Sequence, residues 1–210
     1  MLSAKAMQGY SEGHGWCRLF VIGAALVLVA CQRDISIKLE YEVPQALVEQ
    51  SARKVGIFFP PKFSAAAYHE ESDERGTWYI DLGSAQVAMF NKVLGDLFAN
   101  LEQLPSLENL AVDIALVPHL NKVQFATPQE SGFEHFESWV EYRIEFVNQG
   151  GSVEPWLVSG YGQAQAPRFG SNQPGIETAL KQALRNVAAK IATGLPKNAQ
   201  LQSYFGSTGQ

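Results

Sequence analysis

The stretch SWVEYRIEFV at residues 138–147 decides the fold, because apolar and polar side chains alternate along it with a period of two. The charged residues and Trp139 fall on one side, while the other side carries Val140, Tyr142, Ile144 and Phe146. This pattern predicts a strand with one buried face, which is typical of an antiparallel sheet. Glycines at 150–151 permit a tight turn, so residues 153–166 are expected to return as the partner strand.

Two other segments carry apolar residues at helical spacing. The first begins at Ser84, whose hydroxyl can cap a helix N-terminus, and ends before Pro105. Its apolar stripe consists of Val87, Phe90, Leu94, Leu97, Phe98 and Leu101. The second runs from Pro174 to about Thr193. Its apolar stripe consists of Ile176, Leu180, Leu184, Val187 and Ile191.

Residues 54–59, 77–82 and 111–126 are expected to form further strands, and a short strand near 35–39 is one option. The charged stretch at 69–76 is expected to be a loop. The elements then follow the order strand, strand, helix, strand, strand, strand, helix. This order predicts an α+β fold, a two-layer sandwich of a mostly antiparallel sheet with two amphipathic helices on one face.

The residues Leu28-Val29-Ala30-Cys31 close a run of apolar or small residues that begins at Leu19. Such a run spans only about 18 Å as a helix, which is well short of the roughly 30 Å hydrocarbon core of a bilayer. A cleaved signal peptide therefore fits the length better than a membrane-spanning helix. Cleavage between Ala30 and Cys31 would leave Cys31 as the first residue, with a thiol that can form a thioether with a lipid.

Residues 28–31 resemble the lipobox of bacterial lipoproteins, in which Leu, a small or branched residue and a small residue precede Cys. The resemblance implies acyl chains on Cys31 that hold the protein on a membrane. It also implies the periplasmic leaflet of the outer membrane of a Gram-negative bacterium, because Gln32 stands where an Asp would cause retention at the inner membrane. The alternative is that Cys31 is an ordinary buried thiol after a short hydrophobic helix.

The lipobox, the hairpin of 140–166 and the amphipathic C-terminal helix together look like small envelope-assembly lipoproteins. These include the lipopolysaccharide-assembly lipoprotein and accessory lipoproteins of exopolysaccharide and curli export. The likeness lies in element order and anchor, so it transfers no functional residue beyond Cys31.

These features divide the 210 residues into four segments. They are a signal peptide (1–30), a lipidated tether (31–52), a single α+β domain (53–196) and a C-terminal tail (197–210). Residues 31–210 carry 14 basic and 20 acidic side chains, a formal net charge of −6. Nucleic acid is not expected as a partner, because phosphate binding needs clustered Lys and Arg. The two cysteines are Cys17 and Cys31, so the domain has no disulfide to stabilise it.

Three histidines after the anchor are candidate metal ligands, and none has a metal-binding pattern around it. His69 precedes the acidic residues of 70–74, which lack the spaced oxygens and central glycine of a calcium loop. His119 lies within an apolar strand, and His135 lacks the spacing of a zinc-binding helix. The sequence also contains no phosphate-binding loop, dinucleotide fingerprint or nucleophile elbow. Neither a metal, a cofactor nor an enzymatic activity is therefore expected.

Trp139 favours a binding role, because it lies on the polar side of the most regular strand. Trp156 is interpreted as its approximate cross-strand neighbour, and the two together form a candidate partner surface. The alternative is that this face is also covered, which would make both tryptophans part of the core.

Two hypotheses of function follow. The first is a non-enzymatic, lipid-anchored accessory or scaffold protein of an envelope assembly or export complex, with the membrane and an envelope protein as partners and a homo-oligomer left open. Confinement by the lipid would raise its local concentration near that partner, so that modest contacts suffice. The alternative is a periplasmic binder of a lipid or glycan, in a pocket between the sheet and the helices.

Overall fold

The computed structural model describes residues 34–40, 45–152 and 154–206. All of these residues belong to one compact unit, 34–210. The strands of this unit are β1 (Asp34–Lys38), β2 (Ser51–Ile57), β3 (Ala67–Ser72), β4 (Gly76–Asp81), β5 (Phe98–Gln103), β6 (Ile114–Ala126), β7 (His135–Asn148), β8 (Gly151–Ser152) and β9 (Trp156–Gln165). Its helices are α2 (Pro61–Ser64), α3 (Gly83–Leu97), α4 (Pro128–Ser131), α5 (Asn172–Gly194) and α6 (Ala199–Gly206), with short 3-10 turns η1 (Ala166–Arg168) and η2 (Leu195–Lys197).

Two mixed sheets form the unit. The larger has the strand order β5-β2-β6-β7-β8, and β9 pairs with β7. Its β5, β2 and β6 are mutually parallel, whereas β6, β7 and β9 are antiparallel. The smaller sheet has the order β1-β4-β3, with β1 parallel to β4. The α+β fold class expected from the sequence is confirmed, and the parallel pairs are an addition that strand periodicity alone does not show.

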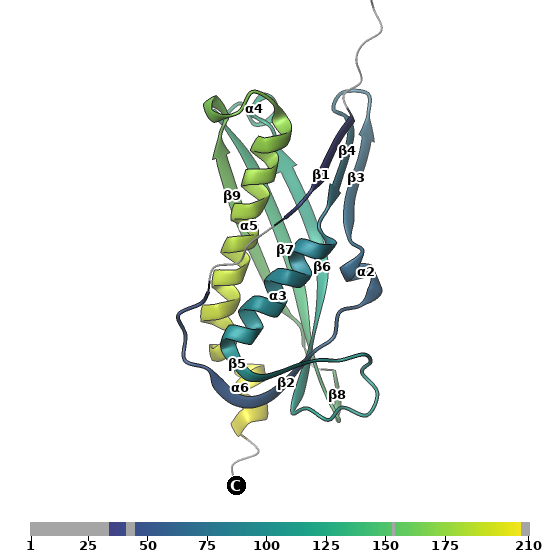
Figure 1. Cartoon of the computed structure of the whole chain (residues 1–210), viewed down its shortest axis with the longest axis vertical. Helices are drawn as coiled ribbons and strands as arrows, with labels where there is room; N and C mark the ends of the chain where they lie inside the picture. Colours follow the sequence, from purple (N-terminus) through teal and green to yellow (C-terminus); the bar gives the residue numbers. More distant parts are fainter. Residues whose placement is uncertain (1–33, 41–44, 153, 207–210) are drawn as a thin grey trace, which may run out of the picture. The chain divides into compact units, whose positions relative to one another are not determined.

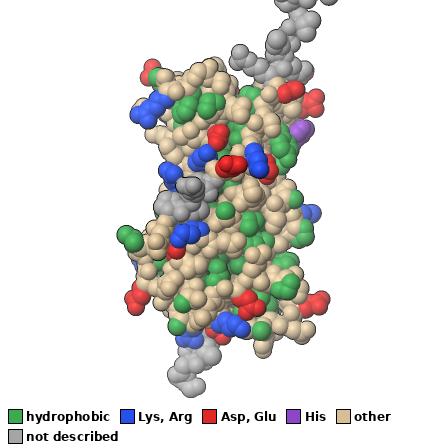
Figure 2. Space-filling model, in the orientation of Figure 1, with side chains coloured by type: hydrophobic (Ala, Val, Ile, Leu, Met, Phe, Trp, Pro, Cys, Tyr) green, Lys and Arg blue, Asp and Glu red, His purple; other side chains and the backbone are tan. Residues whose placement is uncertain are grey.

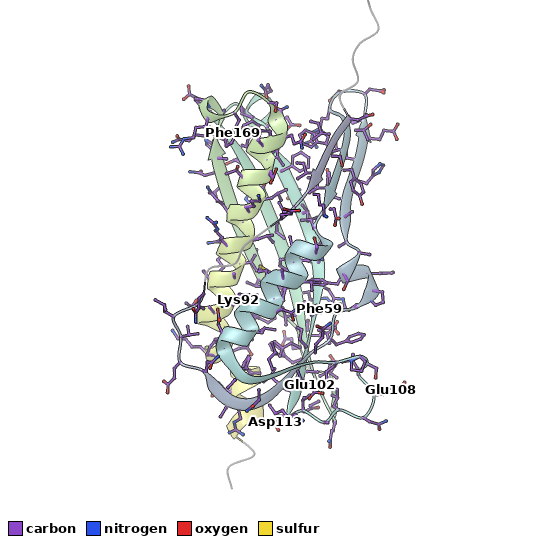
Figure 3. The ribbon with its side chains drawn as sticks, viewed as in Figure 1. Phe59, Lys92, Glu102, Glu108, Asp113 and Phe169 are labelled. Carbon is purple, nitrogen blue, oxygen red and sulfur yellow. The ribbon has the colours of Figure 1, made fainter. Side chains whose placement is uncertain are left out.

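Helices α3 and α5 lie in front of the larger sheet in Figure 1 and cover one face of it, which we call the inner face. All five residues of the expected α5 stripe are fully buried, as are Phe90 and Leu94 of α3. The alternation in β7 and the helical spacing in α3 and α5 build one shared core. At the edge of α3, Lys92 pairs with Asp96 one turn later (Figure 3). The residues that meet the helices from β7 are also fully or almost fully buried: Val140, Tyr142, Ile144 and Phe146.

Helix α5 lies unusually close to β9, because two glycines replace side chains at the contact. A Cβ on Gly160 would overlap the carbonyl oxygen of Ala183. One on Gly162 would overlap the carbonyl oxygen of Ala179 in the same way. The helix backbone therefore packs directly against the strand backbone.

A row of polar side chains along α5 forms hydrogen bonds with the backbone of β9, which is an edge strand of the larger sheet. The side-chain oxygen of Gln182 accepts the backbone N–H of Gln163, and that of Asn186 accepts the backbone N–H of Tyr161. Lys190 donates its ammonium group to the carbonyl oxygen of Ser159 at 2.7 Å. The helix thus satisfies backbone groups that an edge strand would otherwise leave open.

The opposite, outer face of the larger sheet is covered at one end only. There the connection from β5 to β6 folds over the sheet and forms a small second core of Leu104, Val112 and Ala115, with Phe58, Leu107, Leu110 and Val147 packed against it. Glu108 lies on this connection, away from the helices (Figure 3). The rest of the outer face carries no such cover among the described residues, and it is where the candidate site lies.

An ion-pair cluster centred on Arg75 joins the two sheets. Arg75 follows β3 and pairs with Glu70 of that strand and with Glu130 of α4. Its guanidinium also lies 4.6 Å from the ring centroid of Phe125 in β6. Hydrogen bonds from Tyr68 and Arg75 hold the pKa of Glu70 below its ordinary value against the opposing effect of burial, the largest single influence on it. The cluster therefore ties the charged edge of the smaller sheet to the larger one.

Two local expectations differ from the structure, and two short elements lie outside the expected domain range of 53–196. Residues 69–72, expected as part of the charged loop 69–76, belong to β3, which pairs with β4. His69 and Glu71 are exposed, whereas Glu70 is half-buried beside Arg75. Residues 98–103, whose Phe98 and Leu101 fit a helical stripe, form β5 because β2 offers a parallel partner. The strand β1 is the short strand offered as one option near 35–39, and α6 lies in the segment expected as a C-terminal tail.

Candidate functional site: the open sheet face

The exposed part of the outer face is a regular grid across β6, β7 and β9. Register places Gln124, Trp139 and Tyr161 side by side in one row across the three strands. Residues paired directly across antiparallel strands have Cβ atoms only about 5 Å apart, so neighbours within a row can contact the same small ligand. The row on one side of it consists of Lys122, Glu141 and Ser159, and the row on the other side of Ala126, Glu137 and Gln163. We call these nine residues the aromatic grid.

Two aromatic rings occupy the centre of the aromatic grid. The rings of Trp139 and Tyr161 lie 5.3 Å apart at an interplanar angle of 45°. Their exposed fractions are 39% and 38%, although their inner-face neighbours along β7 and β9 are buried. Leu157, farther along β9, adds another exposed apolar side chain to the same face. Solvent-facing aromatic groups of this kind mark binding surfaces more often than isolated exposed side chains do.

Hydrogen bonds fix the Tyr161 ring in place. Its hydroxyl donates to Glu137 Oε1 at 2.7 Å and lies 3.2 Å from Gln163 Oε1. Partial burial and the neighbouring carboxylate of Glu137 raise the pKa of Tyr161 to about 12, since both disfavour the phenolate. His135 Nε2 lies 3.2 Å from the same carboxylate oxygen, and its ring stacks on that of Phe133. The ring of Tyr161 is therefore neutral and held at a defined angle throughout the physiological pH range.

A depression of about 340 Å³ opens beside Trp139. Glu141, on its rim, accepts a hydrogen bond from the amide of Asn121, which stands at an irregularity in the β6–β7 register. The lining combines one aromatic wall with an amide, a carboxylate, an ammonium group and a hydroxyl. Such a lining can stack a flat apolar surface and hydrogen-bond the polar groups around it. Its members are Lys122, Gln124, Trp139, Val140, Glu141 and Ser159.

Trp156 does not belong to this surface. The expectation that it lies across from Trp139 is wrong, because register pairs Trp156 with Ile144 and pairs Trp139 with Tyr161. Paired residues point to the same side of a sheet, so Trp156 shares the inner face with the buried Ile144. It is half-buried against the core, and its ring approaches Gly194 at the end of α5. Of the two tryptophans of the candidate partner surface, the structure therefore places only Trp139 on an open face.

The helix side offers a second concavity of about 330 Å³. It lies between the segment 45–48 and helices α3 and α5, with Val93, Ala188 and Ala192 as its apolar floor. Figure 2 shows this side of the molecule, where acidic and basic side chains are interspersed. The space between sheet and helices, by contrast, is filled by the core side chains. A binding pocket on the helix side would therefore lie outside the helices and not between them and the sheet.

The remaining sequence candidates lie apart from one another. His69 is in β3, opposite Tyr79, and His119 on the outer face lies 3.5 Å from Glu145. In the part of the chain that the structure describes, no three His, Cys, Asp or Glu side chains come together as metal ligands. Within the same ranges, no helix has the length and apolar character needed to cross a bilayer. Ala30 and Cys31 lie outside the described residues.

Comparison with known proteins identifies the fold. No protein-family model and no curated protein matches this sequence. A crystal structure of a Xanthomonas campestris protein of family DUF330 is similar, with a TM-score of 0.53, 10% identity, and coverage of 80% of this chain and 99% of that one. At that identity the likeness shows a shared fold and no activity.

More distant structures include a minor lipoprotein from Acinetobacter baumannii, with a TM-score of 0.41, 9% identity, and coverage of 69% of this chain and 90% of that one. A PelC dodecamer from Paraburkholderia phytofirmans has a TM-score of 0.33 and 14% identity, and the match covers 70% of this chain and 92% of that one. Bacterial lipoproteins thus occur among the structures that partly resemble this chain. At these scores, neither likeness carries an argument about its role.

Proposed function

We propose that this chain is a lipid-anchored accessory protein of a cell-envelope assembly or export complex, without catalytic activity. In this proposal, acyl chains on Cys31 hold it on the periplasmic leaflet of the outer membrane, and the aromatic grid binds the envelope component that it serves. The anchor is supported by the sequence Leu28-Val29-Ala30-Cys31 at the end of a short apolar run.

One observation carries the binding part of the proposal. The two faces of β6, β7 and β9 differ in how they are covered. Helices cover the inner face, whereas Trp139 and Tyr161 are exposed at the centre of the outer face. The two rings stabilise the sheet where they contact each other, but about two-fifths of each side chain remains in water and is not used by the core. A surface that retains them is therefore best explained by contact with a ligand or partner.

The anchor is tested by substituting Cys31→Ser in the full chain expressed in a Gram-negative host. We expect loss of radiolabelled or clickable palmitate incorporation and accumulation of the uncleaved precursor, because serine cannot form the thioether. Membrane fractionation of the unsubstituted chain should place it with outer-membrane markers. Normal acyl labelling of the Cys31→Ser chain would refute the anchor.

The binding surface is tested by cross-linking and co-purification of the lipidated full chain. Trp139→Ser should release envelope components that the unsubstituted chain retains, since truncating an interface tryptophan commonly costs about 2 kcal/mol or more. Leu47→Ser is the matched control, because Leu47 is 97% exposed and lies away from the aromatic grid. Equal recovery of every component with both variants would remove this face from the proposal.

A further inference from the structure

The aromatic rings, hydrogen-bonding groups and charges of the aromatic grid restrict the class of ligand that it can bind. We infer that it binds an uncharged glycan chain, with one sugar ring stacked on Trp139 and its hydroxyls bonded by the flanking polar side chains. This inference rests on the proposed use of the outer face as the binding surface. It differs from a pocket between sheet and helices, since that space is filled by the core.

The first argument is the shape of the central row. Trp139 and Tyr161 present ring surface on an otherwise polar part of the sheet, and Gln124 completes their row on β6. Strands lie about 4.8 Å apart and same-face residues about 6.7 Å apart along a strand, so the grid measures roughly 10 Å by 13 Å. That area matches one or two sugar rings. A pyranose has C–H groups on its faces and hydroxyls at its perimeter, which suits an aromatic platform within a polar frame.

The second argument is the supply of hydrogen-bonding groups. Lys122 and Gln124 line the depression beside Trp139, and neither makes a side-chain hydrogen bond or ion pair to another described residue. Gln163 supplies amide N–H donors and a carbonyl oxygen, which lies 3.2 Å from the Tyr161 hydroxyl oxygen. Donors and acceptors therefore stand within one strand spacing of the rings. A partner with many hydroxyl groups can satisfy both kinds.

The third argument is charge. The charged side chains of the aromatic grid are Glu137, Glu141 and Lys122, and Lys190 of α5 reaches the edge of the grid, where it bonds the carbonyl oxygen of Ser159. Two further charged residues, Arg143 and Glu145, lie beyond the grid on β7. Arg143 already pairs with Glu145. The chain as a whole has a formal net charge of −5. An acidic polysaccharide would meet the carboxylates of Glu137 and Glu141 beside the single lysine of the grid, so an uncharged glycan is favoured over an anionic one.

A protein partner fits this surface less well. A stable protein interface buries about 800 Å² on each side and has an apolar, well-packed centre. On the open part of the outer face, the large exposed apolar side chains among the described residues of β6, β7 and β9 are Trp139, Tyr161 and Leu157. Charged and amide side chains occupy most other positions of that face. The apolar area is adequate for a sugar ring but small for the centre of a protein interface.

The test uses the full chain, purified in detergent with its lipid, and three hexasaccharides as probes. Cellohexaose and chitohexaose in its N-acetylated form are uncharged, and hexagalacturonic acid is acidic. Isothermal titration calorimetry should detect binding of at least one uncharged probe and weaker or no binding of the acidic one. Trp139→Ala should weaken that binding about tenfold or more, which corresponds to about 1.4 kcal/mol.

Two further variants keep the test decisive. Gln124→Ala removes a hydrogen-bonding group without touching the aromatic pair and should weaken binding about threefold, the effect of roughly one neutral hydrogen bond. Leu47→Ser should leave binding unchanged, and circular dichroism should show that all variants are folded. Binding that is insensitive to both Trp139→Ala and Gln124→Ala, or tighter binding of hexagalacturonic acid, would overturn the inference.

Failure of the glycan site is distinguishable from failure of the proposed function. If neither uncharged probe binds at about 10 mM, yet Trp139→Ser still releases an envelope protein from the lipidated chain, the glycan is refuted and the binding surface stands. If the uncharged probe binds in a Trp139-dependent manner, the inference is supported whether or not a protein is also released.

Discussion

The inner and outer faces of β6, β7 and β9 share one backbone, yet a tyrosine has a different environment on each face. Tyr142 on the inner face of β7 is fully buried between Phe63 and Phe90, and its hydroxyl makes no hydrogen bond within the described residues. Tyr161 on the outer face is about two-fifths exposed, and its hydroxyl bonds Glu137. The inner face tolerates an unpaired polar atom to gain packing, whereas the outer face arranges polar atoms around exposed rings. This difference separates the surface that stabilises the fold from the surface that can bind.

Truncating the inner face should have the largest effect. Phe90→Ala is expected to lower the free energy of unfolding by about 3–5 kcal/mol, because it removes a fully buried ring that contacts both Phe63 and Tyr142. Leu94→Ala should cost about 2–5 kcal/mol for the same reason. Lys92→Ala, on the exposed side of α3, should change stability by about 0.5 kcal/mol at most. Urea denaturation of the three variants measures their free energies of unfolding. Equal denaturation midpoints would mean that packing on the inner face does not stabilise the fold.

Adding volume at the contact of α5 and β9 should be the next largest perturbation. Gly162→Ala places a Cβ against the backbone of Ala179 and Ala183, so helix α5 must shift away from the strand. Overpacking of this kind commonly costs about 1–3 kcal/mol. Gly170→Ala is a matched control, because nothing lies within 4 Å of a Cβ there and its φ is not positive. A fall in melting temperature for both variants alike would show that the close approach of α5 is not the cause.

The two tryptophans provide the most direct comparison of the faces. Trp156→Ser should destabilise the fold by about 1–3 kcal/mol, since Trp156 packs against the core and the end of α5. Trp139→Ser should cost about 0.5 kcal/mol, because its ring is already partly in water. Thermal unfolding followed by circular dichroism measures both. If Trp139→Ser is the more destabilising of the two, the outer face is covered in solution, and the aromatic grid is not an open surface.

The sequence predicts the inner face better than the outer one. The burial of Val140 and Ile144 follows from alternation alone, and that of Leu180 and Leu184 follows from helical spacing, because both patterns depend on local geometry. The exposure of Trp139 also follows from alternation. These regularities need no knowledge of which strands are neighbours.

Partners across strands do not follow from periodicity, because they depend on register. Trp139 lies nine residues before Asn148, where the turn begins, but Trp156 lies only five after Gly151, so the two cannot face each other across the hairpin. Counting equal numbers of residues on both sides of the turn would have placed Tyr161 near Trp139. This count was the sequence signal from which the Trp139–Tyr161 pair could have been predicted. No local pattern indicates that Gln124 of β6 approaches Trp139. Strand β5 is missed for a related reason, since its partner β2 is distant in sequence and parallel to it.

The smallest expected effect concerns the titration of Tyr161, which tests whether the outer face is organised as described. Its pKa of about 12 lies above the ordinary value of 10, so the folded state holds this proton more tightly than the unfolded state does. The stability linked to Tyr161 is therefore fully present below about pH 10 and is lost as the pH rises toward 12. Tyr161→Phe should remove that part of the alkaline slope in the unfolding free energy.

Glu137→Gln should lower the pKa of Tyr161, because the negative charge that accepts its hydrogen bond is gone, although burial beside Trp139 remains. Glu145→Gln, which alters a carboxylate of the same face that pairs with Arg143, is the control and should leave that pKa in place. Ring-selective NMR of labelled tyrosine across about pH 9–13 follows the titration directly. An unchanged pKa in Glu137→Gln would show that the hydrogen bond does not fix the Tyr161 ring, and the ordered platform beside Trp139 would lose its main support.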